Sequence, residues 1–223
     1  MHIGLIGGIG PAATDHYYRR LIKAFAGRAE TLDLTIAHAD AATLLAHLST
    51  NDTAAQAAIF LGLTRRLAAA GAQVVAVTSI GGHFCIEDFK AVSPLPVIDL
   101  LSSVPDRLQK AGYRTVGILG TRTVMQSAMY GCLPMLRVLP PRDGFLDAVH
   151  QSYVDMATAG VVTEAQRQVF FDCGRDLCEG AGAEAVLLAG TDLFLAFDGR
   201  DPGFKAVDCA LLHLEDLIEA AAR

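Results

Sequence analysis

Four segments of this chain place small or polar residues directly after an apolar run, and their residue types could bind or transform a ligand. These segments are Gly7–Thr14, Thr78–His83, Gly120–Thr123 and Gly190–Asp192. Glycine amides can approach an anion closely, Ser and Thr hydroxyls can donate to it, and His and Asp can move protons. Because ligands of parallel sheets lie beyond the carboxyl ends of the strands, we expect the site at these turns.

The turn Thr78–Gly81 contains half of a serine-hydrolase elbow. Val77 stands where the G-x-S-x-G form needs glycine. His83 follows Ser79 by four residues, and a histidine there more often caps or packs than acts as a base, which disfavours a Ser/His hydrolase. Gly81 and Gly82 instead permit the backbone amides of a helix start to face an anion such as a carboxylate.

The segment Gly8–Ala13 satisfies the G-x-G-x-x-G/A pattern of dinucleotide sites. The acidic residue that should follow the second strand would have to be Asp40, which comes late. A tight turn with Pro11 at the first helical position explains the same residues. A nucleotide-binding module therefore stays as an alternative that rests on this segment alone.

Composition sets outer limits on the function. The chain has 223 residues, of which 52% are hydrophobic and 19% charged, so it can bury one large core or two small ones. The net charge of −6 comes without a basic cluster, which argues against a nucleic-acid partner. No apolar segment reaches the roughly 18 to 20 residues that span a bilayer, so we expect no membrane association.

Cysteine usage predicts a compartment. The five cysteines are odd in number and irregularly spaced, so they form neither a disulfide framework nor a paired zinc motif. The first predicted strand begins at His2, which leaves no room for a signal peptide. We expect a cytoplasmic protein without a bound metal.

The order of predicted elements indicates an α/β fold. In the first part of the chain we expect strands and helices in alternation, with strands that are continuously apolar, as in a parallel sheet covered on both faces. The strands are Ile3–Gly7, Leu34–His38, Val74–Thr78 and Pro96–Leu100; the helices are 12–26, Ala54–Ala70, Ile86–Val92 and Val104–Lys110.

The pattern then begins again, which predicts two similar lobes, each with a parallel sheet flanked by helices. We assign residues 1–100 plus 206–223 to the first lobe and 101–205 to the second. The second series of strands is Thr115–Gly120, Met135–Leu139, Ala185–Ala189 and a short strand near 206–207, and the helices are Thr163–Glu179 and Leu211–Ala222.

Taken together, the turn sequences resemble the aspartate/glutamate racemase family, which also includes hydantoin racemase and arylmalonate decarboxylase relatives. The segment Ile3–Thr14 is similar to the family's opening loop, and Gly117–Thr123 with Tyr130 is similar to its second-lobe loop. Asp208 followed by His213 resembles its C-terminal signature. The resemblance runs from end to end of the chain.

This resemblance implies a cleft between two α/β lobes and an amino-acid racemase that uses no cofactor. Moving an α-proton from one face of a carbon to the other needs a base on one side and an acid on the other. Cysteine suits both roles because its thiol titrates near pH 8.5 and lower beside a helix N-terminus. The family therefore has a thiol at each of two turns.

Both thiol positions differ in this sequence. Laid on the family's Cys-Asn-Thr-Ala-His turn, the chain has Ser79–His83, and laid on Gly-Cys-Thr-Glu it has Ala189–Asp192. Ser79 and Gly190 thus stand at the thiol positions. Since a serine hydroxyl is a far weaker acid than a thiol and glycine does not titrate, the two-thiol mechanism cannot run on these side chains.

Two residues next to Ser79 also differ from the family pattern. Other side chains near the two turns could take over the role of the missing thiols. Ile80 and Gly81 replace the Asn and Thr that hold the substrate carboxylate, and Ile80 favours an apolar or larger acid. Asp192 could act as acid or base, or simply be solvated or capping. His83 could shuttle protons, or make a structural hydrogen bond at the helix start. Cys85 is expected to be a buried core residue.

We expect the substrate to be held by hydroxyls and backbone amides at these turns. Ordinary helix capping by threonine is the competing explanation, and it predicts no ligand contact. The candidate binding residues are Gly8, Ile9, Gly10, Thr121, Thr123 and Thr191.

Three hypotheses remain. The first is a racemase-family enzyme with altered acid–base chemistry at Asp192, His83 or a water molecule near Gly190. The second is a catalytically silent homologue that binds a small carboxylate or amino acid. The third is the nucleotide-binding module. A homodimer is expected because dimers are the commonest assembly.

Overall fold

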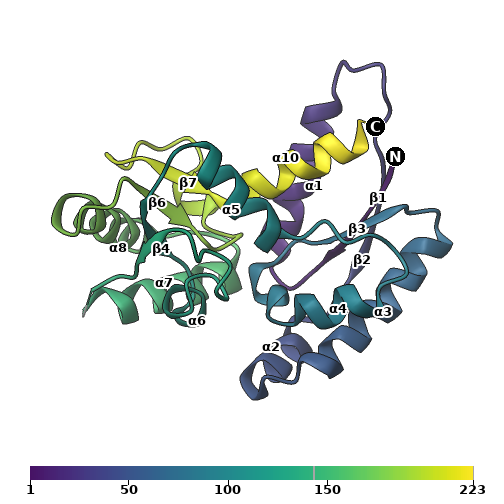
Figure 1. The fold of residues 1–223 in the computed structure, drawn as a ribbon, viewed down its shortest axis with the longest axis horizontal. Coiled ribbons are helices and arrows are strands. Elements are labelled where there is room, and N and C mark those ends of the chain that lie inside the picture. Colours follow the sequence, from purple (N-terminus) through teal and green to yellow (C-terminus); the bar gives the residue numbers. More distant parts are fainter. Residues whose placement is uncertain (143, 223) are drawn as a thin grey trace. The chain divides into compact units, whose positions relative to one another are not determined.

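The computed structural model of the protein describes residues 1–142 and 144–222. The chain forms two compact units, one made of Met1–Leu100 with Ala210–Arg223 and the other of Leu101–Cys209. Each unit has its own parallel sheet with helices packed on it, which confirms the predicted α/β class (Figure 1). None of the described helices combines the length and apolar composition needed to cross a membrane.

The first unit is built on a three-stranded parallel sheet in the order β2-β1-β3. Its strands are β1 (His2–Gly7), β2 (Asp33–His38) and β3 (Val74–Val77). Leu5 in the central strand pairs with Ile36 on one side and Ala76 on the other. Strand β3 and all of β1 after His2 are buried, as expected of a sheet covered on both faces, whereas the edge strand β2 is partly exposed.

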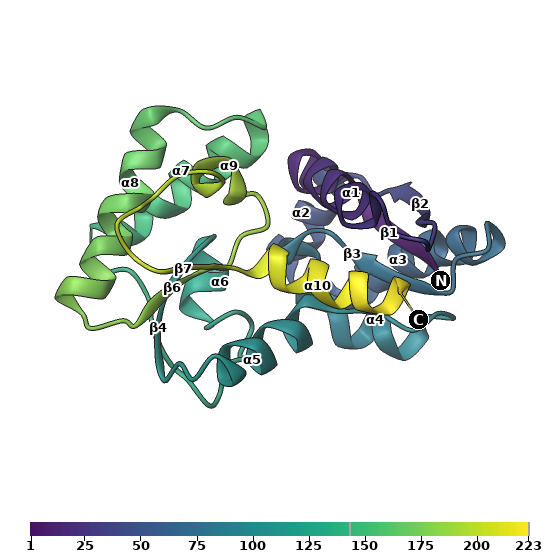
Figure 2. The same ribbon diagram turned by 90° about the horizontal axis from the view of Figure 1, so that it is seen from above.

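Helices cover both faces of this sheet. Helices α1 (Pro11–Phe25) and α10 (Cys209–Ala221) share one hydrophobic cluster with strands β1 and β3, and Figure 2 shows these two helices next to the sheet. On the other face lie α3 (Thr53–Ala69) and α4 (Ile86–Val92), and a Cβ atom at Gly4 would lie 3.0 Å from Leu67 of α3. Gly4 therefore lets α3 approach the sheet closely.

Helix α10 belongs to the first unit because one of its faces is apolar. Ala210, Leu214, Leu217 and Ala221 are buried, and their spacing puts them on one side of a helix. These residues pack against Tyr17, Leu21 and Phe25 of α1 in the same cluster. Full burial of each leucine contributes about 2 kcal/mol, which fixes the C-terminal helix on this sheet.

Two elements between residues 96 and 110 differ from the prediction. The expected strand Pro96–Leu100 makes only an isolated parallel bridge between Val75 and Val97. Pro96 has no N–H to extend the ladder, and helix α5 (Leu100–Lys110) already begins at Leu100. The expected helix start at Val104 was wrong because Pro105, which is favoured at helix starts, lies inside α5.

Helix α2 (Ala41–Thr50) was not predicted. Asp40 precedes it, and its carboxylate accepts hydrogen bonds from the Thr43 amide at 2.7 Å and the Thr43 hydroxyl at 2.6 Å. These bonds lower the pKa of Asp40. Asp40 is therefore an N-cap, which accounts for the carboxylate that the nucleotide hypothesis would have required.

The second unit has a four-stranded parallel sheet in the order β5-β4-β6-β7. Its strands are β4 (Thr115–Leu119), β5 (Arg137–Leu139), β6 (Ala185–Leu188) and β7 (Ala206–Asp208). Strand β7 pairs with β6, so residues 206–208 belong to this sheet and not, as predicted, to the first lobe. The chain passes from the second unit to the first only after β7, at the start of α10.

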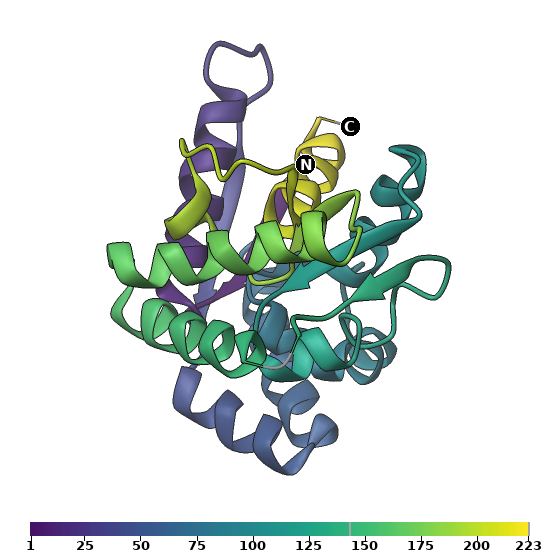
Figure 3. The same cartoon turned by 90° about the vertical axis from the view of Figure 1, so that its left-hand side faces the viewer.

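Two long helices pack together on this second sheet. Helix α7 (Phe145–Ala159), which was not predicted, and α8 (Glu164–Arg175) appear in green in Figure 3. Thr163 and Gln166 form a capping box at the start of α8, and a π turn, η2 (Asp176–Gly180), continues its end. The short helices are α6 (Arg122–Gln126) and α9 (Phe194–Phe197).

A buried histidine, His213, ties α10 to the rest of the first unit. Its Nε2 lies 2.9 Å from the carbonyl oxygen of Ile98, and its Nδ1 lies 2.9 Å from the hydroxyl of Tyr17. Because a carbonyl only accepts, Nε2 carries the proton and Nδ1 accepts from Tyr17. Burial lowers the pKa of His213, so the ring is neutral in the folded protein.

His83 is buried close to His213, with ring centroids 6.2 Å apart. Its Nδ1 donates to the carbonyl oxygen of Ser79 at 2.8 Å, and its Nε2 accepts from the amide of Leu100 at 3.2 Å. Burial, followed by the charge of His213, lowers the pKa of His83 to about 4. Both imidazoles are therefore folded into the core in their neutral forms.

We predict that Leu214→Ala lowers the free energy of unfolding by about 2–5 kcal/mol, because it leaves a cavity in the cluster that joins α10 to α1. Urea unfolding at pH 7 measures this loss. Leu45→Ala is the matched control, since Leu45 is 60% exposed and its truncation should change stability by no more than about 0.5 kcal/mol. Equal losses in the two variants would contradict the assignment of α10 to this core.

We predict that stability falls as pH is lowered from 7 to 5. The unfolded chain protonates His83 near pH 6.5, whereas the folded chain resists protonation until about pH 4, so the unfolded state binds more protons in this range. Protonation of His83 in the unfolded chain should lower the free energy of unfolding by about 2 kcal/mol between pH 7 and pH 5. The lowered pKa of His213 shifts stability in the same direction.

Urea unfolding of the wild type and of His83→Gln at the two pH values tests this. The variant should lose less stability than the wild type on acidification, while His38→Gln, which alters an exposed histidine, should lose as much as the wild type. An unchanged pH dependence in His83→Gln would refute the neutral, buried assignment.

Candidate functional site

Two of the predicted turns lie side by side in the first unit, because they follow neighbouring strands. The turn after β1 and the turn after β3 are joined by the hydroxyls of Thr14 and Thr78, which are 3.0 Å apart. Ile9 packs close to Gly82, where a Cβ atom would lie 3.5 Å from Ile9 Cδ1. The carboxyl edge of the sheet thus brings together the opening loop and the Ser79 turn, as expected.

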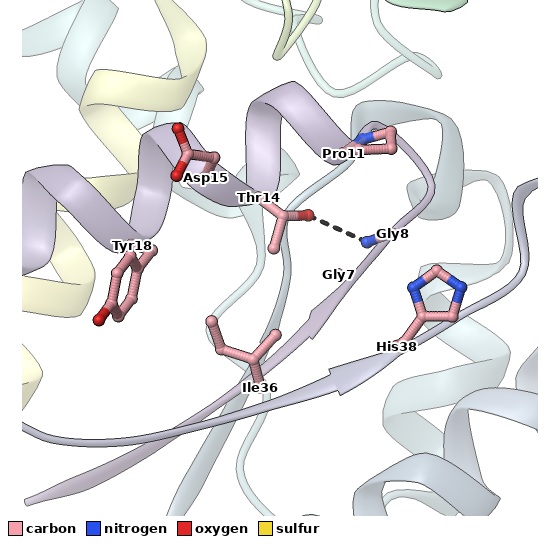
Figure 4. A pocket seen from close by; sticks show the side chains of 8 residues that line it. All are labelled: Gly7, Gly8, Pro11, Thr14, Asp15, Tyr18, Ile36 and His38. Carbon is pink, nitrogen blue, oxygen red and sulfur yellow. Dashed lines mark hydrogen bonds between the residues drawn. The ribbon is translucent and has the colours of Figure 1, made fainter. Parts of the chain in front are cut away.

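Gly8 is required by the shape of the first turn. Its φ is +104°, and a Cβ atom there would lie 2.3 Å from Nδ1 of His38 and 2.7 Å from the carbonyl oxygen of Ala39. Its amide donates to the Thr14 hydroxyl at 3.0 Å (Figure 4). The Gly8 amide is therefore engaged within the turn, contrary to the expectation that it faces a ligand.

Helix α1 begins at the same turn, with Gly10 as its N-cap. The Gly10 carbonyl accepts from the amide and the hydroxyl of Thr14, at 3.0 and 3.2 Å. Among the described residues, the amides of Ile9 and Gly10 have no acceptor. The first turn of α1 contains no acidic side chain, so its positive end is not neutralised locally.

A pocket of about 320 Å³ opens beside this turn, toward strand β2. Figure 4 shows Asp15 and Tyr18 projecting from α1, Ile36 and His38 from β2, and Thr14 directed toward Gly8. Its lining residues are Gly7, Gly8, Pro11, Thr14, Asp15, Tyr18, Ile36 and His38. Ser79 and His83 do not line it, so the pocket and the predicted catalytic turn occupy different sides of β1.

Ser79 begins the short 3₁₀ helix η1 (Ile80–Cys85) and is 7% exposed. Its hydroxyl makes no capping bond and has no hydrogen-bond partner among the described residues. It lies 3.5 Å from where a Cβ atom at Gly81 would stand, so Gly81 leaves space next to it. The hydroxyl is the group at this turn that remains free to meet a ligand.

The other candidates of this turn have structural roles. Ile80 is 1% exposed and belongs to the core, so it does not make a pocket apolar as expected. His83 uses both ring nitrogens in bonds to backbone groups, which argues against a proton shuttle. Burial raises the pKa of Cys85 to about 12, and its thiol donates to the Gly82 carbonyl, as expected of a core cysteine.

In the second unit, the turns after β4 and β6 also lie together. A Cβ atom at Gly120 would lie 2.8 Å from the carbonyl oxygen of Ala189, so Gly120 permits the close approach of the two strand ends. Thr121 is the N-cap of α6, and its hydroxyl accepts from the Val124 amide at 3.4 Å. Thr123 lies in the first turn of α6 and is exposed. Capping therefore explains Thr121, and Thr123 remains available.

The turn after β6 is fully buried. Thr191 is 0% and Asp192 3% exposed, and Gly190 precedes them. Among the described residues, the hydroxyl oxygen of Thr191 is buried without a hydrogen-bond partner. A buried hydroxyl that lacks a partner costs free energy, so this oxygen marks a place where a partner from outside the chain would be stabilised.

Tyr153 of α7, which the sequence did not single out, contacts this turn. Its hydroxyl donates to Oδ2 of Asp192 at 3.3 Å, and its ring lies against Gly190. Burial and the charge of Asp192 raise the pKa of Tyr153 well above its usual value, so the phenol stays protonated. The signal was present, since Val149, Tyr153 and Met156 repeat at helical spacing on a buried face.

The geometry can be compared with proteins of known fold. The model of the family described as Asp/Glu/Hydantoin racemase matches residues 6–217. An Asp/Glu racemase candidate from Yersinia pestis is 24% identical with a TM-score of 0.85, over 100% of both chains. An aspartate racemase homologue from Pyrococcus horikoshii is 24% identical with a TM-score of 0.83, over 100% of this chain and 99% of that chain.

A glutamate racemase from Francisella tularensis, solved in complex with D-glutamate, is 16% identical with a TM-score of 0.67, over 98% of this chain and 80% of that chain. These structures share the two-sheet α/β fold. The family model spans nearly the whole sequence, including every turn at which candidate residues were predicted. The chain therefore belongs to the Asp/Glu/hydantoin racemase family.

Proposed function

We propose that this protein binds a small carboxylate or amino acid and does not racemise it by a two-thiol route. The observation that carries the proposal is the chemistry of the two turns, where Ser79 and Gly190 follow β3 and β6. Neither residue can exchange a proton with an α-carbon as a thiol does. Membership of the family supports the ligand class, and the relative from Francisella tularensis is solved with D-glutamate.

Groups in the first unit support an anionic ligand. The N-terminus of α1 offers the amides of Ile9 and Gly10, and the Ser79 hydroxyl lies on the neighbouring turn. Helix N-termini attract carboxylates through their unpaired amides and the helix dipole. This arrangement favours a carboxylate group over a neutral ligand.

Groups in the second unit support hydrogen bonding to the ligand rather than proton transfer. The Thr191 hydroxyl is buried without a partner among the described residues, and Thr123 is exposed at the start of α6. Asp192 accepts from the protonated phenol of Tyr153, which occupies one of its oxygens. An enzyme that uses Asp192 as its acid or base is the alternative, and it predicts proton exchange at the ligand.

The proposal also includes several features that the family resemblance implies. We propose that the two units correspond to the two lobes of the family, with β7 in the second, and that the protein acts without a cofactor. We also propose that the protein is a homodimer and is located in the cytoplasm. The five free cysteines agree with a reducing compartment.

We predict that the protein binds aspartate or glutamate without exchanging the α-proton. Calorimetry should detect binding, and proton NMR in D₂O should show the α-proton signal decaying no faster than in protein-free samples, because no side chain at either turn serves as a strong base. Exchange above the protein-free rate would favour altered acid–base chemistry. Absence of binding to both amino acids and to simple dicarboxylates would refute the ligand class.

We predict opposite stability effects for Thr191→Val and Thr64→Val. Both threonines are 0% exposed, but the Thr64 hydroxyl donates to the Phe60 carbonyl at 2.8 Å, whereas that of Thr191 has no described partner. Thr191→Val should raise the free energy of unfolding by about 1 kcal/mol, and Thr64→Val should lower it by about 1 kcal/mol.

The same pair of variants reports on function. Thr191→Val should weaken ligand binding about tenfold, since the ligand loses one buried hydrogen bond, while Thr64→Val should leave binding unchanged. Urea unfolding and calorimetry measure the two effects. A stability loss in Thr191→Val together with unaltered binding would show that this hydroxyl serves the fold alone.

A further inference from the structure

The structure shows what excludes a side chain at Gly190. A Cβ atom there would lie 2.3 Å from Cε2, 2.8 Å from Cζ and 3.0 Å from Oη of Tyr153. The backbone conformation of Gly190 does not itself require glycine, because its φ is not positive. The ring of Tyr153 therefore occupies the volume into which any side chain at residue 190 would project.

Tyr153 is held in this position from two directions. Its backbone lies in α7, whose buried face includes Val149 and Met156, and the side chain is only 5% exposed. Its hydroxyl donates to Asp192, two residues after Gly190. Making room for a side chain at residue 190 would require moving a buried ring and stretching this hydrogen bond.

The other thiol position has no comparable obstruction. Ser79 already carries a Cβ and a hydroxyl, and exchange of oxygen for sulfur keeps the shape of the side chain. The oxygen is not tied to another described residue, so replacing it breaks no hydrogen bond within the described chain. The two positions are therefore unequal, since residue 79 can accept a thiol and residue 190 cannot.

We propose that Tyr153 takes the place of the second thiol, so that residues 79, 190 and 153 together separate this chain from a two-thiol racemase. The inference rests on the proposed function and deepens it, because the turn after β6 then presents a protonated phenol paired with Asp192. The phenol keeps its single proton and donates it to Asp192, so it does not withdraw an α-proton. Tyr153 in this sense determines which residue can stand at position 190.

A thermodynamic cycle tests the steric part without any ligand. Gly190→Cys and the smaller change Gly190→Ala are introduced into the wild type, into Tyr153→Phe and into Tyr153→Ala, and each protein is unfolded in urea. In the wild type and in Tyr153→Phe, the change at residue 190 should raise the unfolding equilibrium constant about tenfold or more, because overpacked rings must move. In Tyr153→Ala it should raise that constant by less than about twofold.

Gly62→Cys is the matched control. Gly62 lies in α3 with nothing within 4 Å of a Cβ atom, so its substitution should leave stability within about twofold in the unfolding constant in every background. Equal destabilisation by Gly190→Ala with and without Tyr153→Ala would overturn the proposal. If Gly190→Cys fails to fold with Tyr153 present but folds in Tyr153→Ala, that result supports it.

Proton exchange then tests the functional part. Ser79→Cys with Gly190→Cys should show no exchange of the α-proton of aspartate or glutamate, whereas addition of Tyr153→Ala should produce exchange above the protein-free rate. Exchange in the double variant that equals the triple variant would overturn the role of Tyr153. A cycle with the expected coupling but no exchange in a folded triple variant would leave the steric inference standing and count against the proposed placement of the thiol positions.

Discussion

The close approach of the Tyr153 ring to Gly190 is the packing constraint that determines which residue can stand directly after β6. A glycine is needed wherever a buried ring approaches a backbone so closely, and glycine brings no titratable group to the end of β6. The phenol donates to Asp192, so this carboxylate is held in a hydrogen bond rather than poised as an acid or base. Packing of Tyr153 from α7 against Gly190 thereby determines which side chains the turn can carry.

The first unit follows the same logic with different residues. The sequence allowed His83 to transfer protons. In the structure both of its ring nitrogens are hydrogen-bonded to the backbone of Ser79 and Leu100, and the ring is neutral in the core. Thr14 closes the loop around Gly8, and Asp40 caps α2. What remains for a ligand is a hydroxyl at Ser79 and the open amides at the start of α1, which suit recognition of an anion rather than catalysis.

The fold was largely predictable because its signals are local. Continuous apolar runs identified β1, β3, β4 and β6, and α4 was predicted with its observed bounds. The strand expected at Pro96–Leu100 was wrong because apolar content does not report whether a ladder can form at a proline. Helices α2 and α7 were missed although both contain apolar residues, and for α7 the helical spacing of Val149, Tyr153 and Met156 was an available signal.

The site was less predictable, since it depends on contacts between distant residues. The neighbouring turns of the first unit followed from strand order, but the burial of Ile80 could not be inferred from its place beside Ser79. Tyr153 lies 37 residues before Gly190 in a helix that was not predicted, and only the three-dimensional packing joins them. Family resemblance identified which positions to inspect, and the packing explained why one of them is glycine.

The most direct measurement of the central claim is a crystal structure of the wild-type protein at a resolution that defines aromatic rings. We predict density for the Tyr153 ring in van der Waals contact with the Gly190 backbone, and a Tyr153 hydroxyl within hydrogen-bond distance of Asp192. A ring turned away from Gly190, with open space at the end of β6, would contradict it.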